Sequence, residues 1–158
     1  MAVNPAPASS GTRAAPRPID PRGPRFNQAV LSIALVLGFL LQDVGGWIVI
    51  PAWAVVLFVG AAFGPRYGPF LRLYAEVVKP RLKPPTELED PRPPRFAAVI
   101  GTVFLTAGTV ALLAGLGGLA WGLALVVAAL AGLSAVTGIC VGCEAYLLLA
   151  RARGLAIS

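Results

Sequence analysis

The fold is decided by residues 96–150, FAAVIGTVFLTAGTVALLAGLGGLAWGLALVVAALAGLSAVTGICVGCEAYLLLA, an almost uninterrupted apolar block. A bilayer core takes about 20 helical residues, so this block is too long for a single membrane span. The run Gly115-Leu116-Gly117-Gly118 divides it, and glycine pairs of this kind suit tight reversals. We therefore expect two membrane-spanning helices here, roughly 96–115 and 119–139.

Residues 28–64 form a second apolar block with the same arrangement. The run Asp43-Val44-Gly45-Gly46 divides it into two helices, roughly 27–43 and 47–64. The chain is 57% hydrophobic and 13% charged, whereas soluble domains are about a quarter charged. These features predict an all-α integral membrane protein with four transmembrane helices. Tryptophans near the two turns are expected to act as interfacial anchors: Trp47, Trp53 and Trp121.

The basic residues are confined to three segments. All 13 Lys and Arg lie before the first predicted helix, between the second and third, or after the fourth, and the two glycine turns hold none. An even number of spans places these segments on one side, which the positive-inside rule identifies as the cytoplasm. Because the basic residues bracket apolar runs, the net charge of +6 indicates contact with membrane lipids and no nucleic-acid partner.

The N-terminal stretch is not expected to be a secretory signal. Residues 1–25 lack the apolar core of about 7–15 residues that a signal peptide needs. Low apolar content with many Pro, Ala and Ser residues is typical of disorder. We expect a disordered cytoplasmic tail over residues 1–18, a membrane domain over 19–153 and a short C-terminal tail over 154–158.

The chain repeats a motif. Asp20-Pro-Arg-Gly-Pro-Arg-Phe26 recurs as Asp90-Pro-Arg-Pro-Pro-Arg-Phe96, with six of seven residues identical. Each copy precedes a predicted hairpin, and repeats of two spans each have the same orientation in the membrane. We therefore predict two tandem parallel-repeat hairpins, about 19–82 and 89–153. Each is expected to end in a short amphipathic helix on the inner membrane surface, over 70–78 and 144–153.

The repeated motif has two interpretations. Its paired arginines suit an anionic ligand. The stronger interpretation is structural, because both copies lie at equivalent helix starts. Asp then caps the chain before Pro, Arg contacts lipid head groups, and Phe lies at the membrane interface. The residues assigned to this lipid-facing role are Arg22, Arg25, Phe26, Arg92, Arg95 and Phe96.

The cysteines form the sharpest chemical motif, Cys140-Val141-Gly142-Cys143-Glu144. One interpretation is a dithiol for redox or sulfur-transfer chemistry. Another is a metal site, but about four ligands are needed, so Cys140 and Cys143 would require a homodimer or a partner to complete it. The third is two small side chains buried close together. No cofactor is expected.

The polarity of the helix end decides how reactive these thiols are. Placed at the C-terminal end of the fourth span, next to Glu144, the cysteines face a helix dipole that disfavours thiolates. If Gly138 instead breaks the span and Cys140 opens a new helix, the dipole favours them. Glu144 is then a proton acceptor for the thiol or a capping group.

These motifs, with Phe63-Gly-Pro-Arg-Tyr-Gly-Pro69 and the proline-rich run 80–96, resemble bacterial membrane proteins grouped as domain of unknown function 4395. The resemblance covers about residues 19–150 and implies four spans in the bacterial cytoplasmic (inner) membrane. It also implies a soluble thioredoxin-like or sulfurtransferase partner. The resulting hypothesis is a membrane-bound thiol protein that relays electrons or sulfane sulfur through Cys140 and Cys143 at the cytoplasmic face. The alternative is a non-catalytic scaffold that docks a soluble partner through loop 65–95.

Overall fold

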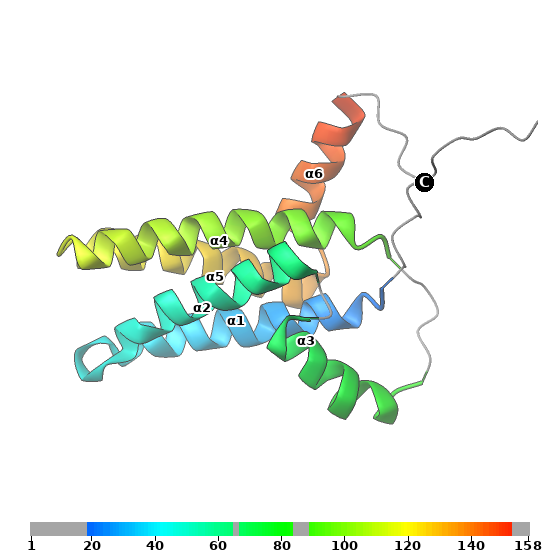
Figure 1. The fold of residues 1–158 in the computed structure, drawn as a ribbon, viewed down its shortest axis with the longest axis horizontal. Helices are drawn as coiled ribbons and strands as arrows, with labels where there is room; N and C mark the ends of the chain where they lie inside the picture. The colour runs from blue at the N-terminus through cyan, green and yellow to red at the C-terminus, as the bar shows by residue number, and fades with distance from the viewer. Residues whose placement is uncertain (1–18, 65–66, 84–88, 153–158) are drawn as a thin grey trace, which may run out of the picture.

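Four long helices make up most of the protein. The computed structural model describes residues 19–64, 67–83 and 89–152. The long helices are α1 (Arg22–Leu40), α2 (Val49–Phe63), α4 (Arg92–Leu113) and α5 (Gly117–Thr137) (Figure 1). Each is long and apolar enough to cross a membrane, α2 together with the turn before it. The predicted all-α, four-span architecture is confirmed, and the predicted terminal tails lie outside the described residues.

The repeated motif forms the first turn of a helix in both copies. α1 and α4 therefore begin four to five residues earlier than predicted. The Asp20 carboxylate accepts a hydrogen bond from the Arg22 backbone N–H at 3.0 Å, and Asp90 does the same for Arg92 at 2.9 Å. Proline is tolerated in a first turn because its missing N–H would have no intrahelical partner there. The two aspartates thus start the two helices in the same way.

Both hairpin turns lie at one end of the bundle. The first consists of two 3-10 turns, Gln42–Val44 and Gly46–Ile48, around Gly45, and the second runs through Gly115. The starts of α1 and α4 and the ends of α2 and α5 lie together at the opposite end (Figure 1). The lysines and arginines of the described residues lie in the segments at that end, as the sequence predicts.

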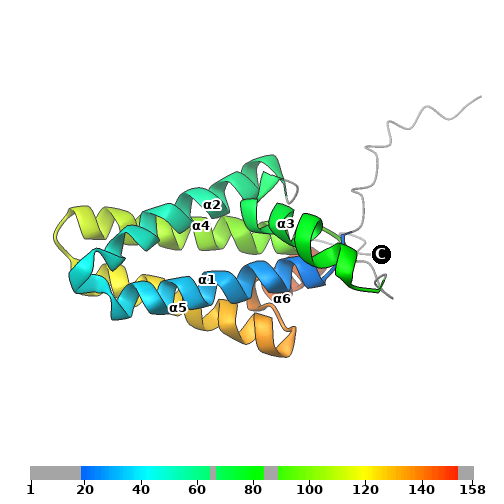
Figure 2. The ribbon, with the colours of Figure 1, turned by 90° about the horizontal axis from the view of Figure 1, so that it is seen from below.

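The two halves exchange packing partners. α1 packs mainly on α5 and α2 mainly on α4, while α4 also packs along α5. α1 and α2 are joined by their turn and diverge from it (Figure 2). Four side chains at these contacts are almost completely buried: Leu31, Leu35, Ile50 and Leu105. The first hairpin therefore has little packing within its own half, whereas the second also keeps an extensive contact between α4 and α5.

Small residues bring the helices close together. Ala120, Ala124 and Ala128 of α5 are buried. The Ser32 hydroxyl of α1 donates a hydrogen bond to the Ala128 carbonyl of α5 at 2.9 Å. Small residues let helix backbones approach in lipid, and here they do so within one chain. The homodimer that would complete a metal site stays a prediction.

Two of the three tryptophans are core residues rather than interfacial anchors. Trp53 is 5% exposed and stacks on Phe70, with ring centroids 4.7 Å apart. Trp121 is 6% exposed and meets Phe39 edge to face at 5.4 Å. Only Trp47 has substantial exposure, at 48%. The anchor prediction is wrong for Trp53 and Trp121, because neighbouring aromatic rings cover them.

Two shorter helical segments leave the bundle at its basic end, toward opposite sides (Figure 1). The first is α3 (Pro69–Leu73), continued by a π-helical segment (Tyr74–Val78) and a 3-10 turn (Lys79–Arg81). The second is α6 (Val141–Ala152). Tyr74 packs against Phe26 at 5.8 Å, and Tyr146 packs against Phe96 at 5.5 Å. The phenylalanine of each motif copy therefore holds the last helical segment of its own half.

The halves also meet through their backbones. Ile19 and Glu89, the residues before Asp20 and Asp90, exchange two hydrogen bonds of 2.9 Å. Across the described ranges this antiparallel bridge is the only β-structure. The residues that directly precede the two motif copies therefore contact each other symmetrically. The duplication itself stays a prediction.

Candidate dithiol site

The chain leaves the fourth span just before the cysteines. α5 ends at Thr137, and Gly138 has a left-handed backbone with φ of 77°. The Gly138 N–H still donates to the Ser134 carbonyl at 3.0 Å, and the Ile139 N–H donates to the Thr137 hydroxyl at 3.1 Å. Because these bonds complete α5, the expectation that the cysteines lie at its C-terminal end is wrong.

Cys140 opens a new helix. Its carbonyl accepts a hydrogen bond from the Glu144 N–H at 2.9 Å, the first backbone bond of α6. Cys143 lies within the first turn of that helix. A helix N-terminus presents unpaired N–H groups and the positive end of its dipole, both of which favour a thiolate. The two thiols are therefore placed with the polarity that makes them reactive.

Cys140 is the more acidic of the two thiols. Its pKa is lowered from 9.0 to about 6, chiefly by a hydrogen bond from the Cys143 thiol. Burial opposes this shift, while the Ser134 hydroxyl and the backbone N–H groups of Gly142 and Cys143 add to it. Both cysteines are free and half-buried. The Cys140 thiol therefore loses its proton more readily than the Cys143 thiol.

Cys143 has the opposite character. Its hydrogen bond to Cys140 raises its pKa, and burial raises it further. The negative charges of Cys140, Glu89 and Glu144 act in the same direction. Cys143 therefore stays protonated while Cys140 is ionised. One attacking thiolate beside one protonated thiol is an arrangement suited to disulfide exchange.

Residues from both halves support this turn. α6 packs closely on α4, since a methyl group added at Gly142 would lie 2.8 Å from the Ala97 Cβ. The Arg25 guanidinium lies against Gly138: one of its nitrogens is 2.7 Å from the position that a methyl group added at Gly138 would take. Ser134 is 5% exposed. Sequence reasoning missed the roles of Ser134 and Arg25 at this site. The only signal was that the last turns of an otherwise apolar span carry two hydroxyl residues, Ser134 and Thr137.

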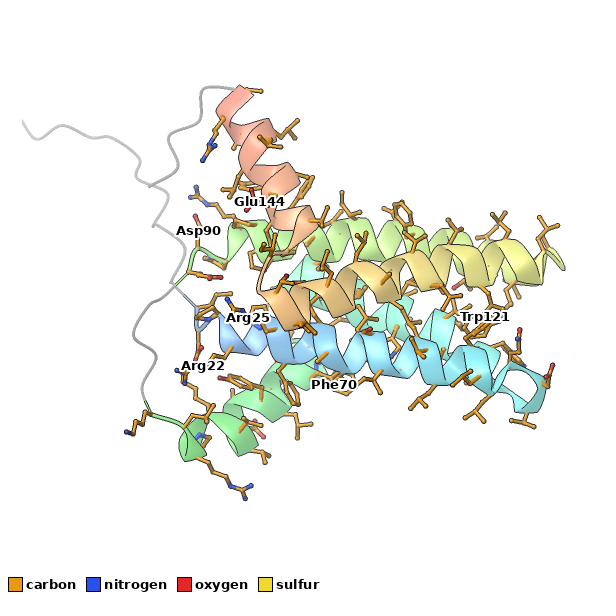
Figure 3. All side chains as sticks on the ribbon, turned by 180° about the vertical axis from the view of Figure 1, so that it is seen from behind. Arg22, Arg25, Phe70, Asp90, Trp121 and Glu144 are labelled. Carbon is orange, nitrogen blue, oxygen red and sulfur yellow. The ribbon has the colours of Figure 1, made fainter. Side chains whose placement is uncertain are left out.

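Glu144 lies in the first turn of α6 and is exposed. Figure 3 shows it at the same end of the bundle as Arg22, Arg25 and Asp90, with Trp121 toward the other end. A carboxylate near a helix N-terminus stabilises the helix. Its negative charge also raises the pKa of Cys143. Proton acceptance by Glu144 stays a prediction.

The motif arginines also have partners inside the protein. Arg95 donates two hydrogen bonds to the last turn of α2, to the Ala61 carbonyl at 2.6 Å and to the Ala62 carbonyl at 2.8 Å. Arg22 donates to the Lys83 carbonyl at 3.2 Å. Contact of the six motif residues with lipid head groups stays a prediction. Arg95 has the additional role of joining the second half to the first.

Among the residues that the structure describes, the cysteines gather no further metal ligands. Within residues 19–64, 67–83 and 89–152, no three Cys, Asp or Glu side chains group closely enough to hold a metal ion. Two thiols supply half of the four ligands that structural zinc takes. The chemistry that these residues can perform by themselves is that of a dithiol.

Comparison with known proteins gives one match. The family model described as "Domain of unknown function (DUF4395)" matches residues 19–151. No curated protein and no solved structure matches the chain significantly. The matched segment contains both motif copies, the four long helices and both cysteines.

Proposed function

The chain belongs to the DUF4395 family, and we propose that this member is a membrane-bound thiol protein that accepts electrons or sulfane sulfur from a soluble partner through Cys140 and Cys143. One observation carries the proposal: Cys140 stands at the N-terminus of α6 with Cys143 in the following turn. Two thiols of opposite acidity, held within reach of each other, serve disulfide exchange better than they serve packing.

The electron-accepting step starts from the Cys140–Cys143 disulfide. A partner thiolate attacks the Cys143 sulfur, and Cys140 departs as a thiolate because the more acidic thiol is the better leaving group. The partner's second thiol loses its proton and attacks the mixed disulfide, so the partner becomes a disulfide and Cys143 takes up the proton. Two electrons have then passed from the partner to the protein.

The sulfur-accepting step starts from the reduced pair. The Cys140 thiolate attacks the terminal sulfur of a partner persulfide, which releases the partner as a thiolate and leaves a persulfide on Cys140. Attack by Cys143, with loss of its proton, then forms the disulfide and releases hydrosulfide. In the electron-accepting route, Cys140 is the first sulfur to leave and Cys143 is the second. In the sulfur-accepting route, Cys140 attacks first and Cys143 attacks second.

The proposed membrane placement puts this site at the cytoplasmic face of the bacterial inner membrane. The basic end of the bundle is then cytoplasmic by the positive-inside rule. α3 and α6 leave the bundle sideways at that end (Figure 1), which supports their lying on the inner membrane surface. The shared helix starts, the matching aromatic pairs and the Ile19–Glu89 bridge support descent of the two halves from one duplicated hairpin.

Labelling with a membrane-impermeant maleimide tests both the placement and the chemistry. Inside-out vesicles at pH 7 should label Cys140, right-side-out vesicles should not, and mild oxidation should block the reaction by forming the disulfide. Cys140→Ser should lose most of the label. Absence of labelling from the cytoplasmic face of intact vesicles would leave two packed cysteines without a redox role.

Replacing both cysteines in the living cell distinguishes the scaffold alternative from the thiol protein. Its loop 65–95 lies partly outside the described residues, at 65–66 and 84–88. A scaffold whose Cys140 and Cys143 are both replaced by serine should still bind its partner and support the same phenotype. A thiol protein with this double substitution should lose the phenotype.

A further inference from the structure

A cavity of about 160 Å³ opens between the four long helices, beside Cys140. Most of its wall is apolar and comes from all four helices, including Leu31, Leu57, Phe104 and Val127. An apolar cavity of about 150 Å³ holds one benzene molecule. The space therefore fits a single six-membered ring, while a longer apolar chain attached to that ring would extend beyond it.

The cavity has a polar end. Asn27 and Gln28 line it from the first two turns of α1, at the same end as Cys140. Their amide groups donate hydrogen bonds. Arg95 lines it too, but its guanidinium already bonds the last carbonyls of α2. An apolar space with a few donors at one end is typical of a site for a ring that carries oxygen acceptors.

A molecule that reacts with the thiols from this cavity must be able to accept electrons. Cys140 lines the cavity, and a dithiol that becomes a disulfide gives up two electrons. A ring with carbonyl oxygens that accepts two electrons and dissolves in lipid is a quinone. We propose that this cavity binds the ring of a lipid-soluble quinone and that the reduced Cys140–Cys143 pair converts it to the quinol.

The reaction balances with one proton from water. The Cys140 thiolate and the Cys143 thiol together lose two electrons and one proton and form the disulfide bond. The quinone takes up these two electrons, that proton and one further proton. The soluble partner of the proposed function then reduces the disulfide again. This step therefore rests on the proposed function and identifies the quinone as the acceptor of the partner's electrons.

Gly60 and Gly122 provide matched variants. Gly60 of α2 lines the cavity, and a methyl group added there meets nothing within 4 Å. Gly60→Leu should therefore fill space in the cavity without displacing the backbone. Gly122 of α5 has equally open surroundings, is exposed and does not line the cavity. Gly122→Leu controls for the cost of placing leucine at a helical glycine.

The experiment uses the full chain in phospholipid nanodiscs, reduced and then freed of reductant without oxygen. A fully substituted benzoquinone with a ten-carbon tail is added, and quinol absorbance and remaining thiols are measured. One quinol per chain should form as two thiols disappear. Gly60→Leu should slow this about a hundredfold, since displacing a reacting group by about 1 Å costs that much, while Gly122→Leu should match the unchanged protein.

A soluble aromatic disulfide serves as the second acceptor. If the protein reduces this disulfide but not the quinone, or if Gly60→Leu reduces quinone as fast as Gly122→Leu, the quinone proposal is wrong and the thiol function stands. The same holds if, in detergent solution, added phospholipid but not added quinone protects Cys140 from alkylation, because an acyl chain then occupies the cavity. If Cys140 reacts with neither acceptor, both proposals fail.

Discussion

The two halves of the molecule begin alike and end differently. Each starts with a helix whose first backbone N–H donates to a preceding aspartate, and each packs its last helical segment through a Phe–Tyr pair. After the second helix, the first half continues Gly64-Pro-Arg-Tyr-Gly68-Pro69, and the second continues Gly138-Ile-Cys-Val-Gly142-Cys143. Pro69, the first residue of α3, corresponds to Cys143 in the first turn of α6. The same break in the chain is followed by α3 in one half and by α6 with its thiol pair in the other.

The largest expected difference is in thiol acidity. Cys143→Ala removes the hydrogen bond that contributes most to lowering the pKa of Cys140. Alkylation of the unchanged protein should fall as the pH drops through about 6. In the variant it should already fall near the ordinary thiol value, about two pH units higher. The measurement is the alkylation rate between pH 5 and pH 9 in separate buffers.

A smaller shift in the same direction is expected for Ser134→Ala, because the Ser134 hydroxyl contributes less than the Cys143 thiol. A midpoint that stays near pH 6 in Cys143→Ala would show that the helix terminus alone makes Cys140 acidic. The reactive character of the second half would then come from its backbone rather than from the pair.

The next effect distinguishes Gly64 from Gly138, the glycines that follow the ends of α2 and α5. Alanine is strained at Gly138 (φ of 77°) and at Gly64 (φ of 98°), with a cost of about 1–3 kcal/mol each. At Gly138 the added methyl group also meets the Arg25 guanidinium, whereas at Gly64 it meets nothing within 4 Å. Both variants should unfold at lower temperature in detergent, but only Gly138→Ala should also slow alkylation of Cys140. Equal alkylation rates in the two variants would contradict a role for Gly138 in placing the thiol.

The smallest effect concerns Arg95, the motif arginine that joins the second half to the first. Arg95→Gln loses hydrogen bonds to the Ala61 and Ala62 carbonyls, where a positive charge also suits the helix C-terminus. We expect about 1 kcal/mol of lost stability, since both bonds are partly exposed to solvent. Thermal unfolding of Arg95→Lys, which keeps the charge but not the paired geometry, should give an intermediate value. Unchanged unfolding of Arg95→Gln would assign this arginine to lipid alone.

The spans were predictable because length, apolar content and the placement of charge depend only on local sequence. The sequence could not predict whether the cysteines lie at the end of one helix or at the start of the next. A glycine in an apolar run can either lie inside a helix or end it. Gly132 lies inside α5, whereas Gly138 ends it. In the first half a proline follows Gly64 and signals the break. No proline follows Gly138, so only the three-dimensional structure distinguishes a continuing helix from a new one.

The contacts of the site depend on how the halves pack. Ser134 reaches Cys140 only because the chain turns back at Gly138. Arg95 bonds α2 because the halves exchange partners. Trp53 was misassigned for the same kind of reason, since Phe70, which covers it, belongs to a segment that the pattern placed on the membrane surface.

The exchange of packing partners has a consequence for biosynthesis. α1 and α2 leave the ribosome first, but their main neighbours, α5 and α4, belong to the second hairpin. About 75 residues separate the end of α2 from the end of α5, which at about 5–20 residues per second take roughly 4–15 s to synthesise. During that interval the first hairpin sits in the bilayer with lipid on the surfaces that the second hairpin will later cover. Assembly is thus a displacement of lipid by the second hairpin, and only afterwards can Arg25 of the first half lie against Gly138 in the dithiol turn.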